Sequence, residues 1–132
     1  MKGIATKVSK GLIPGSILTC ADNSGAKTIM IINKIGKAGS HKRLASVGIG
    51  DVVLASVKSG TPQYIKKKVR AVIIRQRQPM RRANGMRVRF EDNAAILITD
   101  SNLPVGTEVK GAMAREVIER YIKLAGIASR VV

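Results

Sequence analysis

Several residue types are scarce in this sequence of 132 residues, and each shortage narrows the possible functions. The single cysteine, Cys20, excludes an internal disulfide bond and a zinc site built from several cysteines, and it suits the cytosol. The single histidine, His41, has no carboxylate beside it in the sequence, which argues against a catalytic triad or a metal site. We therefore expect no enzyme activity, no cofactor, no metal and no small-molecule substrate.

Aromatic residues and long apolar runs are also scarce. The chain has two tyrosines, one phenylalanine and no tryptophan, whereas modules that read single strands usually stack bases on exposed aromatic rings. The longest apolar run, Ala94 to Ile98, is far too short to span a bilayer, and the basic N-terminus lacks the apolar region of a secretory signal. These features indicate a cytoplasmic protein that recognises a folded nucleic acid by its phosphates and shape.

Acidic residues are outnumbered by basic ones. Eight Asp and Glu face 24 Lys and Arg, which gives a net charge of +16 and a pI near 10.9. Such an excess indicates a polyanionic partner, with nucleic acid the leading candidate and an anionic membrane the second. The hydrophobic content of 45% is that of a globular protein, so we expect one folded domain over residues 1–132.

The stretch from Tyr64 to Phe90 contains no acidic residue and two strand signals, Ala71 to Ile74 and Met86 to Phe90. Side chains alternate between the two faces of a strand, so Met86, Val88 and Phe90 should face a core while Arg87 and Arg89 face outward. Asn84-Gly85 favours a tight reversal. We predict a β-ribbon that binds phosphates through ten cations: Lys66, Lys67, Lys68, Arg70, Arg75, Arg77, Arg81, Arg82, Arg87 and Arg89.

The remaining pattern predicts a mainly β protein, a small five-stranded antiparallel β-barrel with a protruding basic β-ribbon and a short C-terminal helical region. Residues 1–14 form a basic N-terminal arm, and residues 113–126 form a helix, with Val117, Ile118, Tyr121, Ile122 and Ala125 on one face. The other expected strands are Gly15 to Ala21, Thr28 to Ile35, Asp51 to Lys58, Ala94 to Thr99 and Thr107 to Lys110.

Three other functions stay open on the residues alone. A nuclease would need Asp22, Asp51, Glu91 and Asp92 to converge on metal ions, but Asp22 and Asp51 lie at turns, where Asp normally bonds its own backbone. A peripheral membrane protein would need a basic amphipathic element, and the one expected helix is nearly neutral. The third open function is that of a free-standing translation factor with a small barrel.

Two stretches carry a resemblance to a known family. Cys20-Ala-Asp-Asn-Ser-Gly-Ala-Lys27, and Ala71-Val-Ile-Ile74 followed at set spacings by Asn84-Gly85, Phe90 and Asn93, resemble the universal large-subunit ribosomal protein family fourteen. Gly39 to Arg43, Pro104 to Thr107 and Ala114 to Glu116 follow in the same order, so the resemblance covers about residues 15–128. The long arm before Pro14 is similar to the archaeal or eukaryotic type.

The resemblance implies a structural constituent of the large ribosomal subunit that binds large-subunit rRNA and bridges to small-subunit rRNA. It also implies contacts with ribosomal proteins of large-subunit families three and twenty-four, and with an anti-association initiation factor. That factor would dock on a face made of Thr107, Glu108, Lys123, Leu124 and Gly126. A second rRNA-binding patch would comprise Asn23, Ser24, Lys27, His41, Lys42 and Arg43.

Overall fold

The structure is a computed structural model that describes residues 6–36 and 45–132. Its centre is a closed barrel of five strands: β2 (Ile17–Cys20), β3 (Ala26–Lys34), β4 (Val52–Gly60), β5 (Lys68–Arg75) and β8 (Ala94–Ile98). Four of the strand pairings are antiparallel, and the β2–β8 pairing that closes the barrel is parallel. The predicted barrel is confirmed, with a mixed rather than wholly antiparallel sheet.

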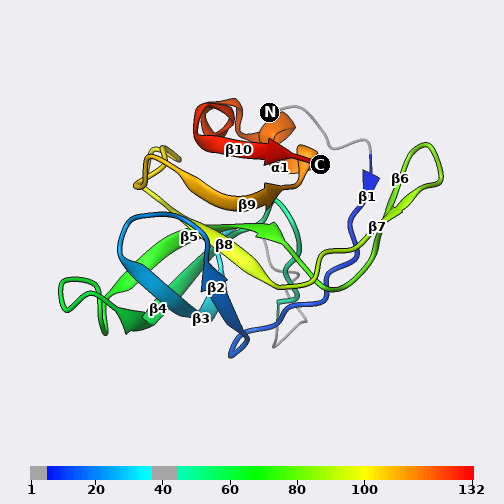
Figure 1. The fold of residues 1–132 in the computed structure, drawn as a ribbon. Helices are drawn as coiled ribbons and strands as arrows, with labels where there is room; N and C mark the ends of the chain where they lie inside the picture. Colours follow the sequence, from blue (N-terminus) through cyan, green and yellow to red (C-terminus); the bar gives the residue numbers. More distant parts are fainter. Residues whose placement is uncertain (1–5, 37–44) are drawn as a thin grey trace.

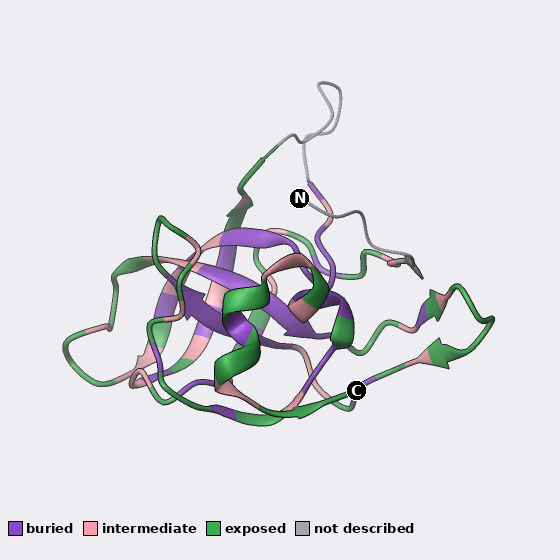
Figure 2. Ribbon diagram, turned by 90° about the horizontal axis from the view of Figure 1, so that it is seen from above, coloured by how far each residue is buried: buried purple, intermediate pink, exposed green. Residues whose placement is uncertain are grey.

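The barrel interior is filled by the aliphatic side chains that alternate along its strands. Leu18 on β2 and Ile29 on β3 are register partners and both are buried. Every residue of β8 is buried, because the C-terminal elements cover the outer side of the barrel there. Seen from above, the helical turns lie over the buried strands (Figure 2).

A hairpin of β6 (Met80–Arg82) and β7 (Arg87–Val88) projects away from the barrel, and β1 (Thr6–Lys7) pairs with β6 (Figure 1). The predicted Asn-Gly reversal is confirmed, since Gly85 has φ 86°, which glycine tolerates best. The prediction that Ala71 to Ile74 pairs within this ribbon is wrong. Those residues belong to β5, which pairs with β4 and β8 in the barrel.

The in-and-out assignment along residues 86–90 is largely confirmed. Phe90 is buried, Val88 is half-buried, and both Arg87 and Arg89 are exposed. The prediction that Met86 faces a core is wrong, because this residue is 61% exposed. The hairpin projects beyond the body of the domain, so the face that should pack on a core has nothing beneath it at this position (Figure 1).

The C-terminal part forms a layer over the barrel, made of β9 (Val109–Met113), α1 (Arg115–Arg120), the 3-10 helix η1 (Ile122–Ile127) and β10 (Ala128–Val131) (Figure 1). Strand β10 runs parallel to β9 and was not predicted. The single helix expected over residues 113–126 is wrong, because the backbone breaks at Tyr121, with φ −129° and ψ 80°.

The break at Tyr121 changes which side chains are buried. After it, Leu124 is fully buried, whereas Ile122 is 76% exposed and Ala125 is exposed. A continuous helix would have placed Ile122 beside Ile118 on the inner face.

The described part of the predicted N-terminal arm lies against the domain. Thr6 pairs with Arg82 in the three-stranded sheet, and Leu12, which is buried, forms an isolated bridge with Val47. No helix in the described ranges is long and apolar enough to cross a membrane.

Candidate nucleic-acid interface

The basic stretch is divided between two ends of the molecule. Strand β5 starts beside the β4–β5 loop on one side of the barrel and leads toward the β6–β7 hairpin on the opposite side (Figure 1, Figure 2). One end, here called the lysine end, carries the exposed side chains of Lys27, Lys58, Lys66, Lys67 and Lys68. The other, here called the arginine hairpin, carries the exposed Arg77, Arg81, Arg87 and Arg89.

The lysine end is built by a close approach of two turns. Thr61 donates its amide to the Gly25 carbonyl at 3.0 Å, and Lys66 donates its amide to the Val57 carbonyl at 3.1 Å. Gly60 has φ 150°, and a Cβ there would lie 2.5 Å from the Gly25 carbonyl oxygen, so only glycine fits. This contact brings Lys27 beside the lysines of the β4–β5 loop.

Lys58 was missed in the sequence analysis. The alternation along β4, with Val57 buried, places the Lys58 side chain outside the barrel next to the β4–β5 loop. Strand alternation alone could have identified it.

The arginine hairpin holds two cations directly opposite one another. Arg81 and Arg87 are register partners, and both are exposed. Like charges at opposed positions of a β-ribbon repel each other. Two opposed, exposed arginines on a protruding hairpin are expected where a bound anion neutralises their charge.

Four of the ten predicted phosphate ligands donate to other groups of the protein, among them the exposed Arg77, whose Nε donates to the Glu91 carbonyl at 2.8 Å. Arg75 is buried and donates to both carboxylate oxygens of Asp92, at 2.9 and 3.1 Å, and to the carbonyls of Lys110 and Ala112. Arg82 pairs with buried Glu116, and half-buried Arg70 pairs with Asp100 at 3.1 Å. Sequence reasoning could not find these partners, because each acid lies far along the chain from its arginine.

The second predicted patch is only partly described. Lys27 belongs to the lysine end, whereas His41, Lys42 and Arg43 lie outside the described residues. The Asn23 side chain is tied to the β8–β9 loop, donating to the Thr107 hydroxyl and accepting from the Thr107 amide, each at 2.8 Å. The Ser24 hydroxyl donates to Asp22 at 2.6 Å.

Four of the five residues of the predicted factor-docking face are exposed: Thr107, Glu108, Lys123 and Gly126. Leu124 is wrong as a surface residue, because its side chain is fully buried beneath η1. The bonds between Asn23 and Thr107 hold the exposed β8–β9 loop against the turn after β2.

The carboxylates considered for a nuclease have structural partners. Asp22 accepts from the amides of Ser24 and Leu97, and Asp51 accepts from the Gly48 amide, which confirms the prediction that both bond the backbone at turns. Within the part of the chain that the structure describes, no three His, Cys, Asp or Glu side chains gather as a metal site.

Cys20 is buried and donates to the carboxylate of Asp22 at 3.0 Å. Burial, together with this hydrogen bond, raises the pKa of the Cys20 thiol to about 12. The side chain therefore behaves as the small apolar residue that the sequence indicated.

The comparisons with known proteins agree with the family resemblance. A family model described as ribosomal protein L14p/L23e matches residues 11–132. The chain is 48% identical to the large ribosomal subunit protein uL14 of Methanoregula boonei and 47% identical to that of Halorubrum lacusprofundi, over 100% of both chains in each case. The protein of the same name from Thermoplasma acidophilum is 48% identical, again over 100% of both chains. This chain belongs to the ribosomal protein L14p/L23e family, and it is not an enzyme.

Proposed function

We propose that this protein is a structural constituent of the large ribosomal subunit, where it binds rRNA through the lysine end and the arginine hairpin. The observation that carries the proposal is the opposed pair Arg81 and Arg87 on a projecting hairpin, within a stretch of 27 residues that lacks any acid. The similar archaeal proteins are named as large-subunit proteins, which supports the same role.

The two cationic surfaces are far enough apart to contact different RNA segments. They are joined by β5, which has eight residues and therefore spans roughly 25 Å at the usual rise of a strand. At that separation the two surfaces can each contact a different segment of a folded RNA. The protein would hold two neighbouring segments of folded rRNA at a set separation.

Charge reversal on the hairpin tests the proposal. Arg87→Glu with Arg89→Glu should abolish binding to large-subunit rRNA and leave the circular dichroism spectrum unchanged, because both side chains are exposed. Arg115→Glu with Arg130→Glu is the matched control, since it makes the same change in net charge at exposed positions of the C-terminal layer. Equal losses in the two variants would mean that only the total charge matters and that the hairpin is not the binding surface.

The salt dependence of rRNA binding gives a second measure. If about six of the exposed cations pair with phosphates, the affinity should fall on the order of a thousandfold between about 50 and about 200 mM salt. A flat response would argue against phosphate contacts altogether. Lys66→Glu with Lys67→Glu should reduce the slope of log affinity against log salt concentration by about the value of two phosphate contacts, because the hairpin contacts persist.

The exposed C-terminal face, comprising Thr107, Glu108, Lys123 and Gly126, is proposed to lie at the subunit interface. There it would take part in a bridge to small-subunit rRNA or receive an anti-association initiation factor, with ribosomal proteins of families three and twenty-four nearby in the cytoplasmic ribosome. Lys123→Glu should weaken subunit joining, measured by sucrose-gradient sedimentation, without changing rRNA affinity in the isolated protein. If the Lys123→Glu variant supported subunit joining at the wild-type level, this face would not take part in the bridge.

A further inference from the structure

The outer wall of the barrel carries an apolar stripe that has no part in the two cationic surfaces. Ile17 on β2 is 63% exposed, and its register partner Met30 on β3 is partly exposed. Ile32 and Ile35 continue along the same chain segment, each 36% exposed. Ile13, in the turn before β2, is 48% exposed. These five residues are called the outer stripe.

The outer stripe follows from strand geometry. Ile29 and Ile31 face the barrel interior and are buried, so Met30 and Ile32 between them must face outward. A register shift in the β3–β4 pairing falls between Ile31 and Asn33, and such a bulge re-aims side chains on the outer surface. The solvent-facing side of a strand normally carries polar residues. A group of exposed aliphatic side chains on that side is instead typical of a surface that another molecule covers.

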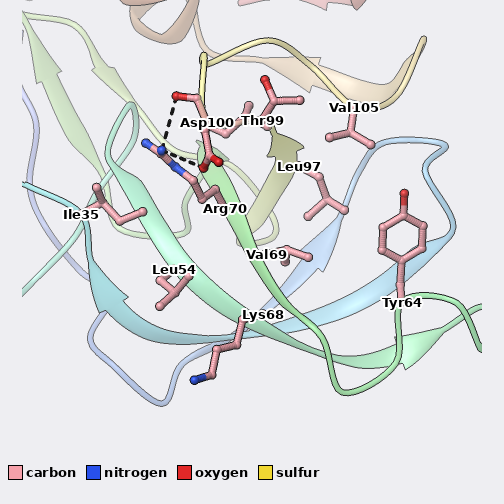
Figure 3. A pocket seen from close by; sticks show the side chains of 11 residues that line it. Ile35, Leu54, Tyr64, Lys68, Val69, Arg70, Leu97, Thr99, Asp100 and Val105 are labelled. Carbon is pink, nitrogen blue, oxygen red and sulfur yellow. Dashed lines mark hydrogen bonds and ion pairs between the residues drawn. The ribbon is translucent and has the colours of Figure 1, made fainter.

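The stripe leads into an open hollow of about 500 Å³. Ile35 and Leu54 form one wall of this hollow, where Leu54 is the register partner of Asn33, and Tyr64 lies on the opposite side (Figure 3). Arg70 lies between them and donates to the Asp100 carboxylate (Figure 3). The Asp100 side chain is 96% exposed, so this ion pair is held only weakly from the solvent side.

The Arg70 guanidinium has hydrogen-bonding capacity left over. Its Nε is buried and has no hydrogen-bond partner within the described ranges, while Nη1 bonds to Asp100. A planar guanidinium binds a carboxylate best through two parallel N–H donors. The Asp100 carboxylate binds Nη1 alone, and the buried Nε is out of reach of an incoming group. A carboxylate that bound both terminal nitrogens, Nη1 and Nη2, would therefore replace one hydrogen bond by two.

We propose that the outer stripe and the hollow bind an extended segment of another protein, which places aliphatic side chains on the stripe and an acidic side chain at Arg70. The ligand chemistry follows from the surface. An aliphatic wall neither neutralises phosphates nor stacks on bases, so RNA gains little there, whereas an apolar core with a charged rim is typical of protein interfaces. The cation at the end of the stripe selects a carboxylate. The inference rests on the proposed assembly into the large subunit, since it is there that such a neighbour would be met.

Photo-crosslinking in assembled large subunits tests the proposal. A chain with benzoylphenylalanine in place of Ile17 is incorporated into subunits, irradiated, and analysed by mass spectrometry. The expected product joins position 17 to a peptide of another subunit protein that contains aliphatic residues and an Asp or Glu. The matched control carries the same probe in place of Ile122, which is 76% exposed but lies off the stripe, and should give a different product. A product with rRNA, a product with a second copy of this chain, or no product at position 17 would overturn the proposal.

Substitution then tests the two parts of the surface. Ile17→Ser with Ile32→Ser, and separately Arg70→Gln, should each reduce retention of the crosslinked protein in salt-washed subunits on the order of tenfold. Neither change touches the arginine hairpin, so rRNA affinity should stay at the wild-type level. Retention unchanged by both variants would contradict the inference. A failure of rRNA binding in the wild-type chain would instead contradict the proposed function alone.

Discussion

The guanidinium of Arg82 donates from Nε to the carboxylate of Glu116 at 2.8 Å, and both side chains are almost completely shielded, at 10% and 3% exposed. A second donor of Arg82 reaches the Val132 carbonyl at 2.7 Å. The pair therefore joins the base of the arginine hairpin to helix α1 and to the last residue of the chain. Its two residues are 34 positions apart in sequence.

Removing one member of this pair should be costly. Glu116→Ala leaves a shielded guanidinium without its counter-ion, and we expect a loss of about 3–5 kcal/mol in the free energy of unfolding, measured in urea. The double variant Arg82→Met with Glu116→Leu should recover most of that loss, because two apolar side chains fill the space without a buried charge. Additive losses in the double variant would show that the two residues do not interact.

Arg75 should matter for stability and little for RNA. Arg75→Met removes four hydrogen bonds and leaves the Lys110 and Ala112 carbonyls without their donor, so we expect a loss of roughly 3 kcal/mol in unfolding free energy. Arg87→Met, at an exposed position, should change stability by less than about 0.5 kcal/mol and weaken rRNA binding several-fold. The two variants should thus show opposite patterns. An rRNA defect in folded Arg75→Met as large as that of Arg87→Met would contradict this division.

Lys66 lies in a left-handed backbone conformation, with φ 65°, which is unfavourable for any residue with a Cβ. Lys66→Gly should therefore raise the unfolding free energy by up to about 1 kcal/mol, after allowing for the greater freedom of glycine in the unfolded chain. The same change should weaken rRNA binding by removing a cation. Lys67→Gly is the control, since it removes an equal charge where φ is not positive, and it should lower stability. Calorimetry and rRNA titration of both variants would test whether a strained lysine is kept for binding.

The Cys20 thiol should be almost inert in the folded protein. Its pKa is raised from 9.0 to about 12, so at pH 8 the thiolate fraction, and with it the rate of alkylation by iodoacetamide, should fall on the order of a thousandfold below that of the unfolded chain. Between pH 9 and about 12 the unfolded thiol ionises first, so this group favours unfolding as pH rises. Cys20→Ala should accordingly lose stability less steeply above pH 9. Rapid alkylation under native conditions would mean that the strand opens.

Much of the site could be predicted from neighbouring residues alone. The alternation at Val88, Arg89 and Phe90 gave correct faces, because a strand fixes its side-chain directions locally and Phe90 has the barrel beneath it. Met86 obeys the same alternation but follows the Asn84-Gly85 turn of the hairpin, where no core lies beneath it, and it is 61% exposed. The local sequence pattern predicts the direction of each side chain, whereas its burial depends on whether another part of the protein packs against it.

The sequence by itself determined the β-barrel of this protein and indicated a polyanionic partner, because strand periodicity and net charge are properties of the residues in order. Only the tertiary structure decided which cations are free to bind that partner. Arg75 and Arg82 are as basic as Arg81 and Arg87, but the fold brings Asp92 and Glu116 to the first two and leaves the others facing solvent. The physical reason is that a charge is available for binding only where folding has not already paired it, and pairing depends on contacts between distant parts of the chain.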